Sequence, residues 1–540
     1  MPLRGQYAPP LRGPLLVTGT FGELRSDHFH AGLDFRAPVG TPVYSVADGY
    51  VSRVKISAGG YGQAIYIDHP DGRRSVYGHL EALAPALHDT VRSLQYQRES
   101  FALDFTPDPD AFPVVRGQEI GEVGNRGFSF GPHLHFELRD STDAPLNPLS
   151  LGLAVADTRP PQLRKLRVYA LGDRDAPVAI TEYALGDGDL PDTIRVASGR
   201  VGLGISAFDR QDAMPNRNGI YAARVTVAGR QTFAFRYDRI PFDRTEYLNA
   251  LTDYAAWKQT SSWYYLLYTR TREALFWTDG RESGDGIIEL RPGEAKAVTI
   301  AVSDYAGNTV KQDLVLRFAE EASPASPPEP YVYVAPEGRS SVVDTGGLRL
   351  ELPATALYDE TLLNYVRLPD GSAGQYSDSH LLHDTHTPLH GRARLTVPAT
   401  RAVPDSLRGR SYIGRCTQDG KYLSVGGHWD GNRMVTDIGS FGTYAIRVDT
   451  LAPTIRIERF GTDQRGSPSF SVLVEEEAGG GIRYRGEVDG RWVLLEHHAK
   501  SGQLRHTYVP GEIGSGLHTF TLRVSDRRGN ERLFTRQFRR

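Results

Sequence analysis

Short runs in which apolar and polar residues alternate, separated by turn residues, predict a mainly β protein. The segments 64–68 and 75–79 flank a Pro-Asp-Gly turn and predict an antiparallel hairpin. Along 133–139, leucine and phenylalanine alternate with histidine, glutamate and arginine, which predicts a strand with two different faces. Helical periodicity is weak elsewhere, so we expect short helices only within 81–97 and 246–259.

A partial repeat divides the C-terminal two-thirds of the chain. The segment 157–161 (DTRPP) resembles 449–453 (DTLAP), and the segment 302–308 (VSDYAGN) resembles 524–530 (VSDRRGN). Alternating runs follow the first pair of segments, and Asp-x-x-Gly-Asn is a turn signature, so we expect two immunoglobulin-like β-sandwiches. A chain of 540 residues is too long for one core. The expected units are 1–156, a sandwich with an insertion at 157–320, a linker at 321–329, a β-rich module at 330–447 and a sandwich at 448–540.

Composition excludes several classes of partner. A formal charge of −3 gives no electrostatic basis for binding nucleic acid or an anionic membrane. Cys416 is the single cysteine, so no intrachain disulfide forms. No apolar run approaches the ~18 residues of a membrane span. The apolar stretch 14–17 near the start is too short for a signal-peptide core, so no signal peptide is visible in this chain.

Three histidine-containing segments in the first 156 residues carry the candidate chemistry. They read HFHAGLD at 28–34, YGHL at 77–80 and GPHLHFELR at 131–139. On a strand, His133 and His135 face the same side, with Cα atoms about 6.6 Å apart. One of them can then bind a metal ion while the other reaches a metal-bound water.

The first segment can supply two ligands to one zinc ion only if the chain bends within it. On an ideal strand, the Cα atoms of His30 and Asp34 would be about 13 Å apart, too far for ligands of one zinc ion. Gly32 between them offers the bend or bulge that would close this gap. His30, Asp34 and one of the pair His133/His135 would then give three ligands of the types that zinc prefers. The fourth position stays open for water, as in catalytic zinc sites.

These motifs, in this order, resemble those of the lysostaphin/LytM-like zinc metallopeptidases, and the resemblance covers residues 18–150. It implies a mostly antiparallel sheet with an open groove. It implies one zinc ion per chain and a water nucleophile. By the same resemblance, His30, Asp34 and His135 bind zinc, whereas His79 and His133 are catalytic histidines that do not bind it.

The resemblance also implies a substrate and a location. We expect a peptidoglycan endopeptidase that cleaves stem peptides or cross-links in the periplasm or at the cell surface, with the sandwich modules available to protein partners. One alternative is a non-enzymatic activator of cell-wall amidases, or a wall-binding module that keeps the fold. Another is a general protease that acts on glycine-rich proteins. Because all five motif positions are filled, the sequence favours an active enzyme.

Four further features bear on the groove and on possible additional sites. The stretch 81–116 is long for this family and is expected to form a lid or rim over the groove. Arg126 and Phe130 stand where the family more often has small polar residues, and both are expected to reshape a substrate subsite. A histidine cluster at 380–390 with Asp384 suggests a metal site, but its composition is more typical of a polar loop. The aromatic residues between 254 and 277 suit a sandwich core or interface better than a glycan platform.

Overall fold

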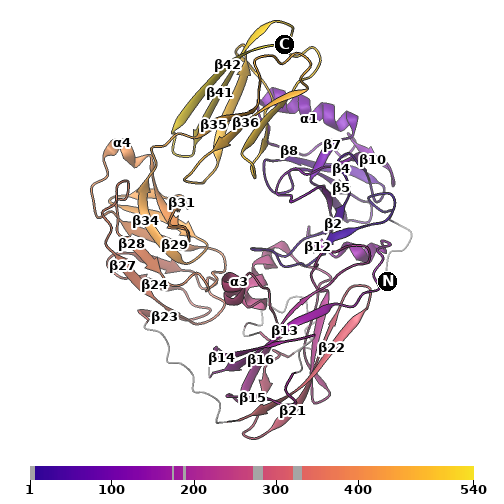
Figure 1. Cartoon of the computed structure of the whole chain (residues 1–540), viewed down its shortest axis with the longest axis vertical. Helices are drawn as coiled ribbons and strands as arrows, with labels where there is room; N and C mark the ends of the chain where they lie inside the picture. The colour runs from indigo at the N-terminus through magenta and orange to yellow at the C-terminus, as the bar shows by residue number, and fades with distance from the viewer. Residues whose placement is uncertain (1–6, 173–175, 187–189, 270, 272–283, 320–330) are drawn as a thin grey trace.

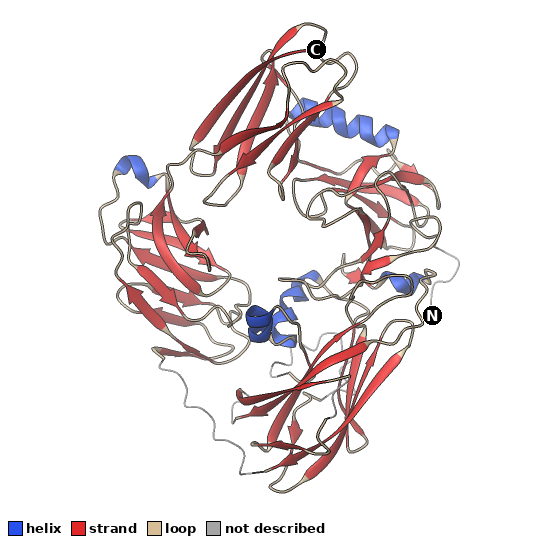
Figure 2. Ribbon diagram, viewed as in Figure 1, coloured by secondary structure: helices blue, strands red, loops and turns tan. Residues whose placement is uncertain are grey.

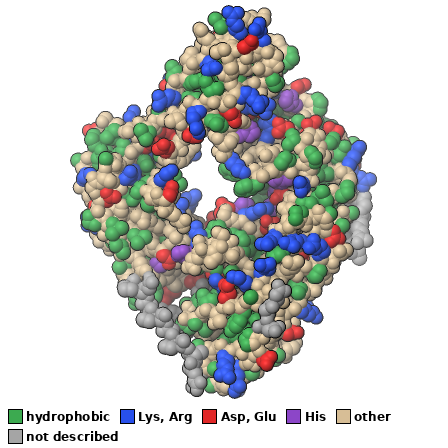
Figure 3. Space-filling model, viewed as in Figure 1, with side chains coloured by type: hydrophobic (Ala, Val, Ile, Leu, Met, Phe, Trp, Pro, Cys, Tyr) green, Lys and Arg blue, Asp and Glu red, His purple; other side chains and the backbone are tan. Residues whose placement is uncertain are grey.

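Four β-rich units are arranged in a ring in the computed structural model (Figure 1). Strands dominate and helices are few (Figure 2), which confirms the mainly β prediction. The space-filling view shows an opening through the centre of the ring (Figure 3). The expected linker at 321–329 lies outside the described residues. The structure describes residues 7–172, 176–186, 190–269, 271, 284–319 and 331–540.

The N-terminal unit is built on one large antiparallel sheet. Its strands, in spatial order, are β1 (Val17–Gly19), β2 (Leu33–Arg36), β11 (His133–Arg139), β6 (Arg74–Gly78), β5 (Gln63–Asp68), β4 (Gly49–Ile56) and β8 (Leu103–Phe105), with β12 (Pro145–Leu146) beside β11 and β9 (Pro113–Val114) beside β4. The predicted hairpin is confirmed, because β5 and β6 pair antiparallel on either side of the Pro-Asp-Gly turn.

A smaller sheet and a helix complete this unit. The sheet contains β3 (Pro42–Tyr44), β10 (Glu119–Val123) and β7 (Leu80–Leu83); the helix is α1 (Pro85–Arg98), and a 3-10 turn, η1 (Pro148–Leu151), follows β12. Helix α1 confirms the helix expected within 81–97. The segment 81–116 supplies no residue to the groove described below, so its predicted role as a lid is wrong. It forms α1 and edge strands instead, and α1 packs against the C-terminal unit.

The second unit contains two sheets. One has β14 (Pro177–Ala184), β13 (Gln162–Leu171), β16 (Arg200–Phe208), β19 (Tyr265–Leu266) and β20 (Ile288–Glu289); the other has β15 (Ile194–Val196), β22 (Thr309–Phe318), β21 (Ala295–Ser303), β17 (Ala222–Val227) and β18 (Arg230–Arg236). Between β18 and β19 come η2 (Phe242–Tyr247), α2 (Leu248–Leu251) and α3 (Tyr254–Thr260), where the sequence predicts a second helical stretch.

The third unit also contains two five-stranded sheets. Its elements are β24 (Ser341–Asp344), β25 (Arg349–Leu352), β29 (Ala393–Pro398), β33 (Arg433–Ile438) and β32 (His428–Asp430) in one sheet; β27 (Tyr365–Leu368), β28 (Ser379–Leu382), β34 (Gly442–Val448), β30 (Ser411–Cys416) and β31 (Tyr422–Ser424) in the other; the pair β23 (Tyr333–Ala335) and β26 (Thr361–Leu363); and the helical turn α4 (Asp405–Arg408).

The C-terminal unit has two four-stranded sheets whose buried side chains share one core. The sheets are β35 (Thr454–Arg459), β36 (Ser469–Glu475), β40 (Gln503–Thr507) and β39 (Glu496–His498), and β38 (Arg491–Trp492), β37 (Ile482–Val488), β41 (Leu517–Asp526) and β42 (Glu531–Arg539). The immunoglobulin-like topology of the two sandwich regions and the unit boundaries stay predictions. Among the described helices, none combines the length and apolar character that crossing a bilayer requires.

The C-terminal unit closes the ring by packing against the N-terminal unit beside α1 (Figure 1). Arg92 on α1 forms an ion pair with Glu512 at 3.0 Å. The ring of Tyr96, one turn further along α1, meets the edge of Trp492 with centroids 5.0 Å apart. The first and last folded units of the chain are therefore in direct contact.

Candidate active site

Strand β11 positions the two histidines of the third motif. Leu134, Phe136 and Leu138 are fully buried in the core, and this confirms the predicted alternation. The opposite face carries His133 and His135, which line a groove of about 910 Å³. In the sheet, His135 pairs with a residue of β2 on one side and with one of β6 on the other. Its side chain therefore lies over the centre of the sheet rather than at an edge.

His30, Asp34 and His135 converge on one point. His30 Nε2 lies 3.1 Å from Asp34 Oδ1 and 3.1 Å from His135 Nδ1, and His135 Nδ1 lies 2.9 Å from Asp34 Oδ1. Asp34 is the register partner of His135 across β2 and β11. The chain bends at Gly32, before β2 begins, and this brings His30 back over the strand. Gly32 is needed for a close approach as well, because a Cβ there would lie 2.3 Å from the carbonyl oxygen of Phe136.

Hydrogen bonds fix the tautomers of both histidines. His30 Nδ1 lies 2.8 Å from the carbonyl oxygen of Thr20, which can only accept, so Nδ1 carries the proton and Nε2 a lone pair. His135 Nε2 lies 2.9 Å from a carboxylate oxygen of Glu137 and donates to it, which leaves a lone pair on Nδ1. Two nitrogen lone pairs and a carboxylate oxygen therefore face one another. This arrangement is repulsive unless a proton or a cation occupies the centre.

The pKa values of Asp34 and His135 also indicate that positive charge is favoured at this centre. Burial would raise the pKa of Asp34, but the charge of His30 and hydrogen bonds from three histidines hold it well below the usual range. Burial would lower the pKa of His135, yet hydrogen bonds to Asp34 and Glu137 raise it to about 9. The donor set of two imidazoles and one carboxylate suits zinc. Ligands about 2.0–2.2 Å from a tetrahedral ion are roughly 3.3 Å apart, close to the separations found here.

His79 and His133 flank this centre. Their rings meet at an angle of 63° with centroids 4.7 Å apart, and His133 Nε2 lies 3.4 Å from Asp34 Oδ1. His79 Nδ1 donates to the carbonyl oxygen of Arg126 at 2.7 Å, and His133 Nδ1 donates to that of Gly131 at 2.8 Å. Burial, with the neighbouring His135 and His133, lowers the pKa of His79 to about 3. Its backbone adopts a left-handed φ of 62° between β6 and β7.

Comparisons with known proteins identify the family of the N-terminal unit and of the third unit. Residues 28–96 match the model of peptidase family M23. The N-terminal unit is a domain of peptidase family M23. Residues 333–449, the third unit, match the model of the Zu5-like domain.

Curated relatives match about a quarter of the chain. DD-carboxypeptidase/endopeptidase Mpg of Neisseria meningitidis is 37% identical over 130 residues, which are 24% of this chain and 24% of that protein. Peptidoglycan DD-endopeptidase ShyA of Vibrio cholerae is 33% identical over 133 residues, which are 24% of this chain and 25% of that protein. The chain thus spans about a quarter of the length of these relatives. Among solved structures, the catalytic domain of lysostaphin from Staphylococcus simulans is 25% identical and covers 24% of this chain and 86% of its own, with a TM-score of 0.19.

A carboxylate that the sequence analysis did not single out supports the centre of the M23 domain. Glu137 is completely buried, and one of its oxygens accepts hydrogen bonds from His135 and from the hydroxyl of Tyr61. Its other oxygen accepts from Arg139 Nε at 2.7 Å. Burial would raise the pKa of Glu137, but the His135 hydrogen bond and the Arg139 charge lower it to about 2. The sequence did contain one indication of this role, because Glu137 lies on the same face of the strand as His133 and His135.

Replacing Glu137 with glutamine is expected to weaken zinc binding. The carboxylate accepts at both ends, whereas an amide must turn its NH₂ group toward either His135 and Tyr61 or Arg139, all of which donate. Loss of such a partner typically lowers metal affinity about 10–100-fold. Competition with a chromogenic chelator measures this, with exposed Glu119→Gln in the same domain as the control. An unchanged affinity in a folded Glu137→Gln protein would show that the carboxylate does not orient His135.

Contacts from the C-terminal unit reach the loop that orients the two flanking histidines. Arg126, whose carbonyl accepts from His79, forms ion pairs at 3.1 Å with Glu81 and with Glu496 of β39. Lys500 donates to the carbonyl oxygen of Ser129 at 3.2 Å and lies over the exposed ring of Phe130. The side chain of Arg126 therefore faces the C-terminal unit and is not among the groove-lining residues, so its expected role in a subsite is wrong. Phe130 does line the groove.

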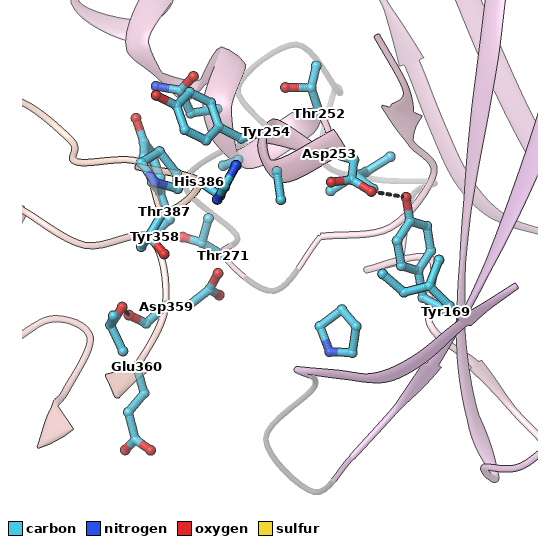
Figure 4. A pocket seen from close by; sticks show the side chains of 18 of the residues that line it. Tyr169, Thr252, Asp253, Tyr254, Thr271, Tyr358, Asp359, Glu360, His386 and Thr387 are labelled. Carbon is cyan, nitrogen blue, oxygen red and sulfur yellow. Dashed lines mark hydrogen bonds between the residues drawn. The ribbon is translucent and has the colours of Figure 1, made fainter. Parts of the chain in front are cut away.

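The histidines at 380–390 do not form a metal site. Within the described part of the chain, no three of these residues and Asp384 bring ligand atoms together. His380 stacks on Tyr365, and His383 Nε2 bonds to Thr387. His386 lines a separate pocket of about 380 Å³ between α3 and the Zu5-like unit, where Tyr169 donates to Asp253 (Figure 4). Several of the aromatic residues expected in a core are buried, whereas those at 276 and 277 lie outside the described residues.

Proposed function

We propose that the chain is a zinc-dependent endopeptidase that hydrolyses peptide bonds in bacterial peptidoglycan. The observation that carries this proposal is the meeting of three lone-pair atoms, from His30, Asp34 and His135, at separations of 2.9 to 3.1 Å, an arrangement that a cation at their centre would stabilise. The M23 assignment and relatives named as peptidoglycan DD-endopeptidases support the substrate class. One zinc ion per chain would be held by these three residues, with a fourth position open to the groove.

The flanking histidines supply proton transfer. Zinc bound at the centre would activate a water molecule and polarise the scissile carbonyl. Because His79 and His133 each donate Nδ1–H to a backbone carbonyl, each turns Nε2 toward the reacting groups. His133 Nε2, beside Asp34, is placed to accept the proton of the attacking water as general base. The other histidine stabilises the oxyanion or protonates the leaving amine.

The shape of the groove suits an extended peptide. Its volume of about 910 Å³ exceeds what a single amino acid needs, and the exposed rings of Phe128 and Phe130 stand on its rim. Peptidoglycan lies outside the cytoplasmic membrane, so the proposed site of action is the periplasm or the cell surface. The other three units would position the M23 domain on the wall or bind protein partners.

Digestion of purified peptidoglycan tests the proposal. Zinc-loaded full-length protein is incubated with purified cell wall, and the released fragments are identified by mass spectrometry. We expect soluble fragments with cleaved stem or cross-linking peptides, and none from a zinc-loaded His133→Ala protein. Release only when a cell-wall amidase is added would instead identify a non-enzymatic activator. Cleavage of casein or elastin-like peptides without action on the wall would identify a general protease.

A further inference from the structure

Three carboxylates meet where the chain enters the second unit. Asp157 precedes β13, Asp209 follows β16 and Asp304 follows β21, and each places an oxygen within 4.8 Å of the others. Asp209 and Asp304 are 2% and 3% exposed. In the described chain, no lysine or arginine forms an ion pair with any of the three. The cluster therefore concentrates negative charge that no ion pair within the described residues neutralises.

The same arrangement recurs where the chain enters the C-terminal unit. Asp449 precedes β35, Glu476 follows β36 and Asp526 ends β41, and their ligand oxygens also lie within 4.8 Å of one another. Asp449 and Asp526 correspond to Asp157 and Asp304 through the repeated segments of the sequence, and Glu476, like Asp209, directly follows a strand. In this unit Asn530 Nδ2 ties Asp526 Oδ2 (2.8 Å) to the carbonyl oxygen of Asp449 (3.0 Å).

The first cluster is braced by the equivalent asparagine. Asn308 Nδ2 donates to Asp304 Oδ2 at 2.8 Å and to the carbonyl oxygen of Asp157 at 3.2 Å. In both units, therefore, an asparagine side chain holds the carboxylates in position through the same two hydrogen bonds. The recurrence of one arrangement in two units of the chain indicates that both units need it at this position.

Buried oxygen atoms in both clusters lack a partner. Asp209 Oδ1 accepts no hydrogen bond although its side chain is almost fully buried, and Glu476 Oε2 is likewise unpaired. In the C-terminal unit Asn530, which is 4% exposed, also leaves its Oδ1 without a donor. A buried acceptor without a partner is energetically costly, so native structures rarely retain one unless an ion or water satisfies it. Every one of these atoms is an oxygen, which attracts a cation.

The titration behaviour agrees with this geometry. Burial, together with the charge of Asp157, raises the pKa of Asp209 to about 7. Burial and the charge of Asp304 raise the pKa of Asp157 to about 6. Because these folded-state values lie above those of the unfolded chain, the cluster destabilises the fold increasingly as the pH rises from about 4 to about 7, and the full cost remains above that. A bound cation would remove that cost.

We propose that each cluster binds one Ca²⁺ ion that braces the junction between neighbouring units. An all-oxygen set with several carboxylates selects a hard cation, and the irregular geometry suits Ca²⁺ better than Mg²⁺, which demands a near-ideal octahedron. The first cluster lines a cavity of about 530 Å³ together with Thr20 and Asn147 of the M23 domain, so an ion can enter there. In the second, the Asp449 amide bonds to Arg410 of the Zu5-like unit, which places that site at the next junction.

Calcium binding to the full-length, zinc-loaded protein tests the proposal. Isothermal titration in calcium-free buffer is expected to show two Ca²⁺ ions per chain, one for each single variant, Asp209→Asn or Glu476→Gln, and none for the double variant. Asp313→Asn and Glu531→Gln, exposed acids on β22 and β42, serve as matched controls and should keep both ions. Zinc content should be unchanged throughout, which separates this result from the peptidase site.

Thermal unfolding provides a second readout. Above pH 7 without calcium, Asp209→Asn should melt at or above the wild-type temperature, because it removes a repelling charge. With about 1 mM Ca²⁺, the wild type should gain roughly 2–4 °C and the double variant nothing. No calcium binding by the wild type, or binding that survives the double variant, would overturn the proposal. An equal response to Mg²⁺ would overturn the assignment to calcium.

Discussion

Replacing Asp34 with alanine is expected to abolish zinc binding and wall hydrolysis together. Asp34 contributes the only carboxylate oxygen of the centre, and that oxygen lies 3.1 Å from His30 Nε2 and 2.9 Å from His135 Nδ1. Two neutral imidazoles then remain, and catalytic zinc sites use three protein ligands. The loss of affinity should exceed the about 10–100-fold expected for an orienting residue. Zinc per chain after dialysis and release of wall fragments are the two measurements.

A neighbouring acid supplies the control for this variant. Asp27 lines the same groove but is largely exposed and contacts His28 rather than the centre. Asp27→Ala should therefore retain zinc. Circular dichroism confirms that both variants fold. A folded Asp34→Ala protein that holds one zinc ion per chain, or that still digests the wall, would contradict the assignment of Asp34 as a ligand.

Replacing His133 with alanine is expected to separate metal binding from catalysis. His133 stands beside the centre with Nε2 3.4 Å from Asp34, but the three converging ligand atoms do not include it. General acid–base catalysis typically contributes 10²–10⁴-fold, so kcat should fall by about that factor while zinc content stays at one per chain. His79→Ala should behave in the same way, since His79 is held by the Arg126 carbonyl rather than by the centre.

The matched control for the histidine variants is His28→Ala. His28 lines the groove and is half exposed, and its side chain bonds only to Asp27 among the described residues. Its replacement should leave both zinc and kcat close to wild type. Loss of zinc from His133→Ala would show that this histidine is itself a ligand, and full activity would remove it from the mechanism.

Local patterns predicted the strand that carries the site. Because side chains alternate along a strand, the sequence 133–139 was enough to place His133 and His135 on one face and three apolar residues in the core. The bend at Gly32 followed from the distance that two ligands of one ion can span. The hairpin of β5 and β6 and the helices near 85 and 250 were likewise determined by neighbouring residues.

Long-range contacts account for what the sequence could not predict. The role of Glu137 depends on Tyr61, which is 76 residues away, and the role of Arg126 depends on Glu496 in another unit. Neither partner is indicated by local periodicity. The segment 81–116 was expected over the groove because of its length alone. The length of a segment does not determine the side of the domain on which it packs. The amphipathic helix α1 within it packs on the C-terminal unit instead.

Anomalous scattering at the zinc absorption edge, from crystals of the zinc-supplied full-length protein, tests the central claim most directly. The account predicts one strong peak in the M23 domain, about 2.0–2.2 Å from His30 Nε2, Asp34 Oδ1 and His135 Nδ1. A difference map without a peak among these three atoms, or zinc ligated by other residues of the groove, would contradict it.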